Sequence, residues 1–120
     1  MSINTLFKTN QLKLKAILRI VGEEEPVFGP GRLQLLQQIE KTGSINQAAK
    51  NMGMSYKKAW QMINSMNTQA EKPLITTQTG GNSGGGAVIT VEGREVMHYY
   101  EGLQKRFQNF LEQETENLQR

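Results

Sequence analysis

The stretch of residues 42–67 reads TGSINQAAKNMGMSYKKAWQMINSMN. It contains two runs of helical spacing separated by Gly53. In the first run the apolar residues recur at positions i, i+3, i+4 and i+7, namely Ile45, Ala48, Ala49 and Met52. Ser44 can cap the N-terminus of this run. We therefore expect a short helix that begins after Ser44 and stops at Gly53.

The second run predicts a longer helix, with Ser55 as its N-cap and an end near Gln69. Its apolar face consists of Tyr56, Ala59, Trp60, Ile63 and Met66 or Asn67. The opposite face carries side chains that are all hydrogen-bond donors: Lys57, Lys58, Gln61, Asn64 and Ser65. The spacing favours core packing for Trp60, and it leaves the role of Tyr56 open between packing and contact with a ligand.

Two helices joined by a glycine turn form the pattern of a helix-turn-helix, here over residues 44–69. Ala48 and Ala49 are small enough to let the two helix axes approach closely, and Gly53 permits a turn geometry that a side chain would resist. A helical hairpin in an unrelated bundle would show similar spacing. We favour the DNA-binding helix-turn-helix.

Charge is distributed unevenly along the chain. Between Lys41 and Ala70 there are four lysines and no acidic residue. Residues 1–90 carry ten basic and five acidic residues, whereas residues 91–120 carry four basic and six acidic residues. A positive body with an acid-free helical segment suits a polyanionic partner such as double-stranded DNA, although a solvated lysine face is the alternative.

The residues after the helix-turn-helix predict a β-hairpin. The β-branched runs LITTQ (74–78) and AVITV (87–91) flank the glycine-rich stretch TGGNSGGG (79–86). A helix-turn-helix followed by a hairpin is a winged helix, so we interpret residues 74–90 as the wing and Asn82 and Ser83 at its tip as weaker DNA-contact candidates. A flexible linker is the alternative interpretation.

The N-terminal third predicts strands followed by one helix. The run LKLKAILRI from Leu12 to Ile20 alternates apolar and basic residues, as in a half-buried strand. After the turn GEEEP, the run PVF can pair back on it, which places strands within about residues 10–30. The run RLQLLQQIEKTG then has helical spacing, and Gly43 is a typical C-cap.

The last segment predicts a long helix over residues 91–119. Its apolar residues alternate by four and three, as in a heptad seam: Val96, Tyr100, Leu103, Phe107 and Phe110. At ~1.5 Å per residue such a helix extends about 40 Å, more than one winged-helix body can cover. The seam therefore predicts a homodimer, and the alternative is a bent helix packed on its own domain.

The residue types give little support for catalysis. The chain has no aspartate, no cysteine and one histidine, so one chain cannot assemble a Ser/His/Asp triad or a three-ligand zinc site from the usual residues. We expect no enzymatic activity, no cofactor and no metal. We also expect one domain of 120 residues that is soluble, cytoplasmic and not associated with a membrane, because no run approaches a membrane span.

Two strings of the chain are specific enough to indicate a family: GSINQAAKNMGMSYKKAWQMINSMN and PLITTQTGGNSGGGAVITVEGREV. They closely resemble the N-terminal DNA-binding domain of the ModE family of molybdate-responsive transcriptional regulators, which is similar in part to that of LysR-type regulators. The resemblance spans about Phe28 to Leu103. It implies a bacterial winged-helix regulator whose dimer forms through helices outside the helix-turn-helix. That family binds molybdate in C-terminal β-barrel modules, and because this sequence stops at Arg120 we expect this chain not to bind molybdate.

Together these patterns predict an α+β winged-helix protein that binds DNA as a homodimer through the start of the second run. Gln61 is our candidate for a base contact, because a carboxamide both donates to and accepts from adenine. Lys57 and Lys58 are candidates for phosphate contacts, and Ser55, Tyr56 and Asn64 complete the predicted face. A winged helix that binds another protein as a co-regulator, and never DNA, is the rival hypothesis.

Overall fold

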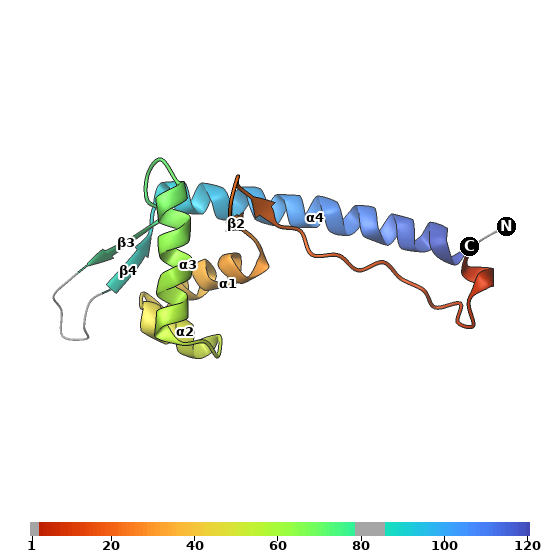
Figure 1. Ribbon diagram of the computed structural model, residues 1–120, viewed down its shortest axis with the longest axis horizontal. Helices are drawn as coiled ribbons and strands as arrows, with labels where there is room; N and C mark the ends of the chain where they lie inside the picture. Colours follow the sequence, from red (N-terminus) through yellow and green to blue (C-terminus); the bar gives the residue numbers. More distant parts are fainter. Residues whose placement is uncertain (1–2, 79–85) are drawn as a thin grey trace. The chain divides into compact units, whose positions relative to one another are not determined.

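The computed structural model describes residues 3–78 and 86–120 (Figure 1). The chain divides into a larger unit, Arg19–Tyr100, and a smaller unit that combines Met1–Leu18 with Glu101–Arg120. Within the described residues there are four α-helices and two small antiparallel sheets. This content confirms the predicted α+β winged-helix class.

Three helices of the larger unit lie close to the predicted ranges, although the first begins at Pro30, two residues before the run that starts at Arg32. They are α1 (Pro30–Thr42), α2 (Ile45–Asn51) and α3 (Tyr56–Gln69). Gly43 ends α1 in the left-handed conformation at φ 69°, and Gly53 occupies the turn between α2 and α3 at φ 67°. Both φ values lie where a side chain would be strained, which is why glycine stands at these two positions.

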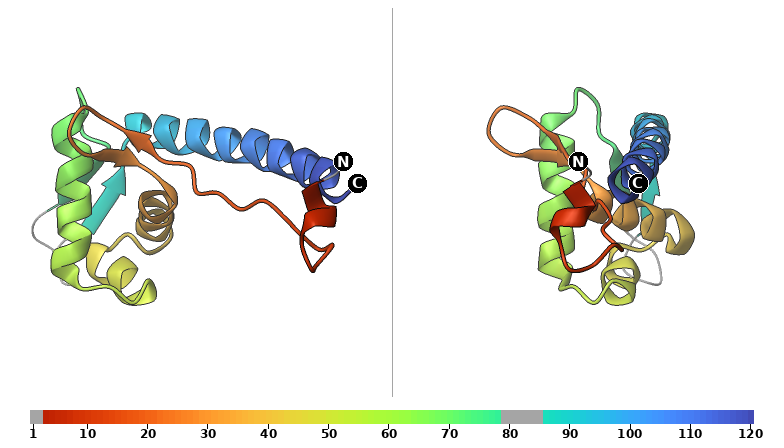
Figure 2. Two further views of the ribbon diagram at one scale, coloured as in Figure 1. Left: turned by 45° about the vertical axis from the view of Figure 1, so that its right-hand side comes forward. Right: turned by 90° about the vertical axis from the view of Figure 1, so that its right-hand side faces the viewer.

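The core of the larger unit lies between the three helices, which cross one another rather than run in parallel (Figure 2). The small residues Ala48, Ala49 and Ala59 are buried at the crossings and allow the backbones to approach. Larger buried side chains fill the space around them: Phe28, Leu35, Leu36, Ile39, Ile63 and Met66. Close packing of this kind holds α3 in one orientation relative to α1 and α2.

The predicted hairpin is present beside α3. Strand β3 (Ile75–Gln78) pairs with β4 (Gly86–Ile89) in antiparallel register, with Ile75 opposite Ile89. Ile75, Ala87 and Ile89 are buried, whereas Thr76 and Val88 are exposed, so the hairpin buries one face. The backbone N–H of Ala87 donates to the carbonyl of Gly43 at 3.0 Å, which joins the wing to the end of α1.

The predicted N-terminal strand is largely wrong. Only β1 (Ile20–Val21) pairs with β2 (Pro26–Phe28), and residues 11–19 have no regular secondary structure. The predicted turn is correct, since the N–H of Gly22 donates to the carbonyl of Glu25 at 2.9 Å. Because β2 has only three residues, its backbone pairs with Ile20 and Val21 and does not extend far enough to pair with Leu12 to Arg19.

The smaller unit consists of a 3-10 helix (Ile3–Leu6), an extended segment up to residue 18, and the last part of α4 (Val91–Gln119). The extended segment runs beside this part of α4 in both figures. Hydrogen bonds join the 3-10 helix and the extended segment to α4. Asn4 Nδ2 donates to the carbonyl of Gln119, the N–H of Leu14 donates to Thr115 Oγ1, and Gln119 Nε2 donates to the carbonyl of Leu12.

The long C-terminal helix is confirmed, but its heptad-spaced apolar residues differ in burial within the chain. Tyr100 is completely buried in the core of the larger unit, where its ring meets Phe28 edge-on at a centroid distance of 5.2 Å. Tyr100 is therefore a core residue and is removed from the predicted dimer interface. Val96 is partly buried against the same core, Leu103 and Phe107 are half-buried, and Phe110 is exposed.

Candidate nucleic-acid interface

Helix α3 presents a polar face that is free to bind a ligand. Lys57, Lys58, Gln61 and Asn64 are all exposed. Among the described residues, none of these side chains has a hydrogen-bond or ion-pair partner. Lys57, Gln61 and Asn64 follow each other at spacings of four and three residues, which places them along one face of the helix. The sequence prediction of a donor-rich face is consistent with this arrangement.

The N-terminus of α3 is held by Ser55. Its Oγ accepts a hydrogen bond from the N–H of Lys58 at 3.0 Å, so the hydroxyl caps the helix. Tyr56 is half-exposed, and its ring meets that of Trp60 edge-on at 6.1 Å. Trp60 packs partly buried against the core, as expected. Tyr56 thus combines a contact within α3 with a surface open to a ligand.

A chain of amide side chains joins α2 to α1, and sequence reasoning missed it. Gln47 Nε2 donates to Asn51 Oδ1 at 2.9 Å, and Asn51 Nδ2 donates to Gln38 Oε1 at 2.9 Å. Gln47 and Asn51 are four residues apart on α2, so their pairing follows from helical spacing. The link to Gln38 depends on the crossing of two helices and leaves no signal in the sequence.

Asn67 attaches the wing to the end of α3. Its Oδ1 accepts hydrogen bonds from the N–H groups of Leu74 and Ile75 at 2.9 and 3.2 Å, and its Nδ2 donates to the carbonyl of Ile75 at 2.9 Å. The sequence pattern placed Asn67 only as an alternative to Met66 on the apolar face. Its side chain instead holds the start of β3 against α3, so it positions the wing relative to the exposed face.

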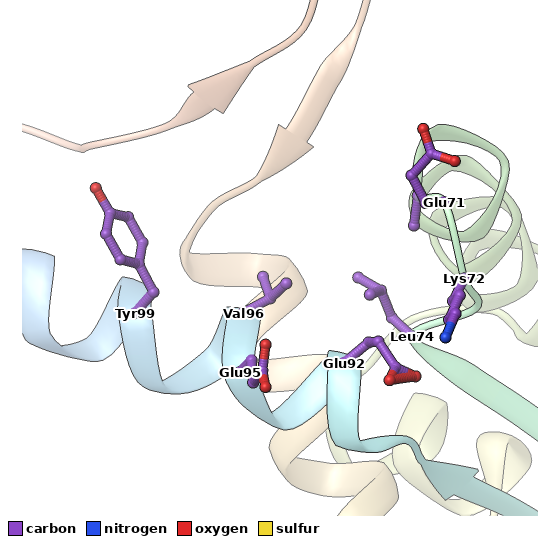
Figure 3. A pocket seen from close by; sticks show the side chains of 8 residues that line it. Glu71, Lys72, Leu74, Glu92, Glu95, Val96 and Tyr99 are labelled. Carbon is purple, nitrogen blue, oxygen red and sulfur yellow. The ribbon is translucent and has the colours of Figure 1, made fainter.

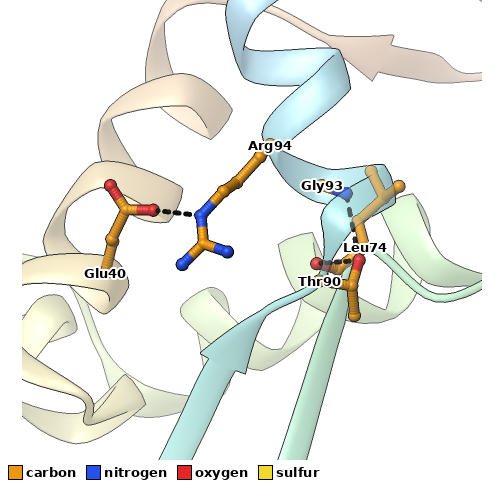
Figure 4. A network of polar contacts seen from close by, with 5 residues as sticks. All are labelled: Glu40, Leu74, Thr90, Gly93 and Arg94. Carbon is orange, nitrogen blue, oxygen red and sulfur yellow. Dashed lines mark hydrogen bonds and ion pairs between the residues drawn. The ribbon is translucent and has the colours of Figure 1, made fainter.

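A second anchor joins the wing to α4 and α1 (Figure 4). Thr90 Oγ1 accepts a hydrogen bond from the N–H of Gly93 at 3.0 Å and donates to the carbonyl of Leu74 at 3.0 Å. Arg94 Nε lies 3.1 Å from Glu40 Oε2 on α1. The T-x-x-G-R string at residues 90–94 therefore caps α4 and joins it to β3 and α1.

Residues 30–94, which contain these helices, the wing strands and the second anchor, match the family described as "Bacterial regulatory helix-turn-helix protein, lysR family". The chain belongs to this family. The match covers the helix-turn-helix and both wing anchors, so it includes every element that positions α3.

Several curated proteins are similar to this lysR-family chain over most of its length. The transcriptional regulator ModE of Yersinia pestis is 50% identical over 92 residues, which are 77% of this chain and 35% of that protein. The DNA-binding transcriptional dual regulator ModE of Escherichia coli (strain K12) is 39% identical over 92 residues, with the same coverage. The molybdenum transport protein ModE of Herbaspirillum seropedicae is 38% identical over 114 residues, 94% of this chain and 41% of that protein. The chain thus spans 35% to 41% of the length of these relatives.

The larger unit of the lysR-family chain also carries an acidic hollow of about 470 Å³ (Figure 3). Apolar side chains of Leu74, Val96 and Tyr99 line it together with the carboxylates of Glu71, Glu92 and Glu95 and one lysine, Lys72. The carboxylates outnumber the lysine and repel phosphates. A polyanion is therefore expected on the face of α3 and not on this hollow.

Asn82 and Ser83, the two DNA-contact candidates predicted at the tip of the wing, lie outside the described residues. Within residues 3–78 and 86–120, no group of three or more metal-ligating side chains comes together, and no helix is long and apolar enough to cross a membrane.

Arg32 donates to the carbonyls of Pro26 and Val27, and burial lowers its pKa while the charge of Glu25 opposes that shift.

Proposed function

We propose that this chain is a sequence-specific DNA-binding transcriptional regulator whose α3 enters the major groove. The observation that carries the proposal is the free, acid-free polar face of α3, held on a lysR-family helix-turn-helix. An α-helix fits the major groove, and side chains near the start of a recognition helix are the ones that reach base edges. Ser55, Tyr56, Lys57, Lys58 and Gln61 stand at that end of α3.

The residues of this face take different roles. Gln61 is proposed for a base contact, because its amide can pair bidentately with adenine. Lys57 and Lys58 are proposed for phosphates, which supply affinity without sequence preference. Asn64, one turn further along α3, extends the face, and Asn82 and Ser83 are proposed for the DNA backbone beside the groove.

We further propose that the chain acts as a homodimer, with Leu103, Phe107 and Phe110 of α4 at the interface and Val96 at its edge. A two-fold dimer reads a palindromic site through two copies of α3. We place the protein in the bacterial cytoplasm, in contact with the chromosome. The expectation that the chain does not bind molybdate stays a prediction, which calorimetric titration with molybdate and with sulfate can test.

The rival function is a winged helix that binds only protein. It would require a partner able to satisfy the lysines and amides of α3 without phosphates, whereas double-stranded DNA satisfies them with phosphates and base edges together. The acid-free stretch 41–70 therefore favours DNA. Selection of bound fragments from a random duplex pool tests the proposal: recovery of one palindromic motif supports it, and recovery of unenriched sequence at every salt concentration would contradict it.

A further inference from the structure

The carboxylates of the acidic hollow are not neutralised by the chain itself. Glu71, Glu92 and Glu95 line the hollow, and Lys72 is the one cation in its lining. Among the described residues none of the three carboxylates forms an ion pair or a side-chain hydrogen bond. The hollow thus carries a net negative charge on a chain whose own net charge is +3. A positively charged partner is attracted to it.

The stability of the fold explains only one of these carboxylates. Glu92 lies in the first turn of α4, where the helix dipole favours a negative charge. Glu95 lies about one turn further along α4, and Glu71 lies in the connection between α3 and β3. Both are exposed, and neither caps a helix. Two carboxylates are therefore left for a cation from outside the chain.

Apolar side chains form the middle of the hollow. Figure 3 shows Tyr99 and Glu71 at its opposite ends, with Val96 and Leu74 between them. Tyr99 is 60% exposed although it is a large aromatic residue. An apolar strip bordered by carboxylates suits a segment that combines apolar and basic side chains, because the stems of lysine and arginine pack on apolar surface while their charges reach an acid.

The surface of the hollow is held rigidly by the wing anchors. The N–H of Leu74 donates to Asn67 Oδ1 at 2.9 Å, and the carbonyl of Leu74 accepts from Thr90 Oγ1 at 3.0 Å. These bonds tie Leu74 to the end of α3 and to the start of α4. A surface that is already ordered loses little conformational entropy when a partner binds.

The hollow lies at the end of α3 that is remote from the proposed DNA contacts. Its lining begins at Ala70, directly after α3 ends at Gln69, whereas the proposed contacts start at Ser55. At ~1.5 Å per residue the length of α3 separates the two by about 20 Å. Phosphates are repelled by the carboxylates, so the occupant of the hollow is a protein segment and not DNA.

The basic and apolar run of the chain itself, residues 12–17, is engaged elsewhere. The N–H of Leu14 donates to Thr115 Oγ1, and the carbonyl of Leu12 accepts from Gln119 Nε2 at 2.7 Å. These hydrogen bonds hold the run along the last part of α4. A different protein is therefore a better candidate for the hollow than a second copy of this chain.

We propose that the hollow docks a segment of a partner protein in which lysine or arginine stands on both sides of a large apolar residue. The apolar side chain packs on Leu74 and Val96, and the cations pair with Glu71 and Glu95. A lysine or arginine that reaches the ring of Tyr99 adds a cation–π contact. This inference goes beyond the proposed function and does not depend on it: one end of α3 binds DNA, and the other end supports a protein-binding surface.

Selection from a library of random dodecapeptides displayed on phage tests the chemistry of the partner. The immobilised full-length chain is the target, and Glu71→Gln with Glu95→Gln is the counter-selection target. We expect the peptides that bind only the wild type to share a large apolar residue flanked by lysines or arginines. The absence of a shared motif, or a motif without basic residues, would overturn the proposal.

The most enriched peptide, labelled with a fluorophore, is then the probe for anisotropy titration. Glu71→Gln with Glu95→Gln should weaken its binding about tenfold, the scale of two partly exposed ion pairs. Glu112→Gln with Glu116→Gln removes the same number of carboxylates from the smaller unit and should leave binding unchanged. Equal affinities for these two double variants would show that the peptide binds elsewhere and would contradict the proposal.

Exchange of the charges tests the pairing itself. Glu71→Lys with Glu95→Lys should abolish binding of the probe and should bind a peptide in which glutamates replace the basic residues. Failure of this exchanged pair to bind would contradict the assigned ion pairs.

Sedimentation identifies the remaining occupant, because Val96 also borders the proposed dimer interface. An unchanged dimer dissociation constant in Glu71→Gln with Glu95→Gln supports a partner protein in the hollow. A dissociation constant raised about tenfold, as for the probe, would assign the hollow to a second copy and overturn the proposal. The peptide experiments contain no DNA, so their outcome is separate from that of the substitutions on the exposed face of α3.

Discussion

A Cβ atom added to Gly93 would overlap the backbone carbonyl oxygen of Leu74. The same Cβ would also meet Ile89 Cγ2 at 2.8 Å. Backbone on one side and a buried side chain on the other leave no room for a methyl group. Glycine at this position of the T-x-x-G-R string is therefore a packing requirement of the junction between the wing and α4, at a φ that any residue can adopt.

Gly93→Ala should lower the free energy of unfolding by about 1 to 3 kcal/mol, because the new methyl group must displace β3 or α4. Gly102→Ala on the same helix is the matched control. There the added Cβ would meet only Arg106 Nη1 at 3.2 Å, the end of a flexible side chain, so the better helix propensity of alanine should stabilise the protein by up to about 1 kcal/mol. Urea unfolding of both variants tests this explanation, and equal unfolding midpoints for the two variants would contradict it.

Asn67→Ala should destabilise the protein by about 1 to 3 kcal/mol, because it leaves the N–H groups of Leu74 and Ile75 without their acceptor. Asn64→Ala, three residues earlier on the exposed face, removes the same amide and should change stability by less than about 0.5 kcal/mol. We expect Asn64→Ala to weaken DNA binding instead. Thermal unfolding and anisotropy titration of the two variants would show opposite patterns, and an identical pattern would contradict the separation of anchor from contact.

Substitutions at Ser55 can separate the effect of the helix cap on stability from the effect of charge on DNA binding. Ser55→Ala should cost about 1 kcal/mol of stability, and Ser55→Asp or Ser55→Asn should recover most of it, since both can cap. Ser55→Asp places a carboxylate where we propose that phosphate approaches, so it should weaken DNA binding while Ser55→Asn does not. Equal affinities for the Asp and Asn variants would indicate that DNA does not approach this end of α3.

Gln61→Ala should relax base preference at one position of each half-site and leave the rest of the motif unchanged. The lost bidentate contact corresponds to about 1 to 3 kcal/mol of discrimination at that position. Repeating the fragment selection with the variant measures this directly. Loss of affinity for all sequences alike would assign Gln61 to the DNA backbone.

The helix-turn-helix could be predicted from the sequence because its determinants are local. Gly43, Ser44, Gly53 and Ser55 end or cap helices through their own backbone and side-chain chemistry, and helical spacing identifies the buried face. These features depend on neighbours a few residues away. The exposed candidate face of α3 follows from the same spacing.

The errors and omissions concern partners that lie in other secondary-structure elements. Alternation in residues 12–20 shows that they suit a strand, but the length of β2 decides how many of them pair. Heptad spacing marks Tyr100 as buried and does not show that Phe28, in its own chain, covers it. Asn67 and Gln38 act through hydrogen bonds to other elements, which no local pattern reveals.

The lysines and amides of α3 are the proposed contacts to duplex DNA. The most direct test is the salt dependence of affinity for the selected duplex, measured for wild type, for Lys57→Ala with Lys58→Ala, and for a control that removes two lysines elsewhere, Lys8→Ala with Lys72→Ala. We predict that the α3 variant loses affinity and that its slope of log affinity against log salt becomes shallower by about 4, because each of the two protomers loses two phosphate contacts, while the control matches wild type. Equal affinities and slopes for the two double variants would contradict the assignment of α3 as the DNA-binding helix.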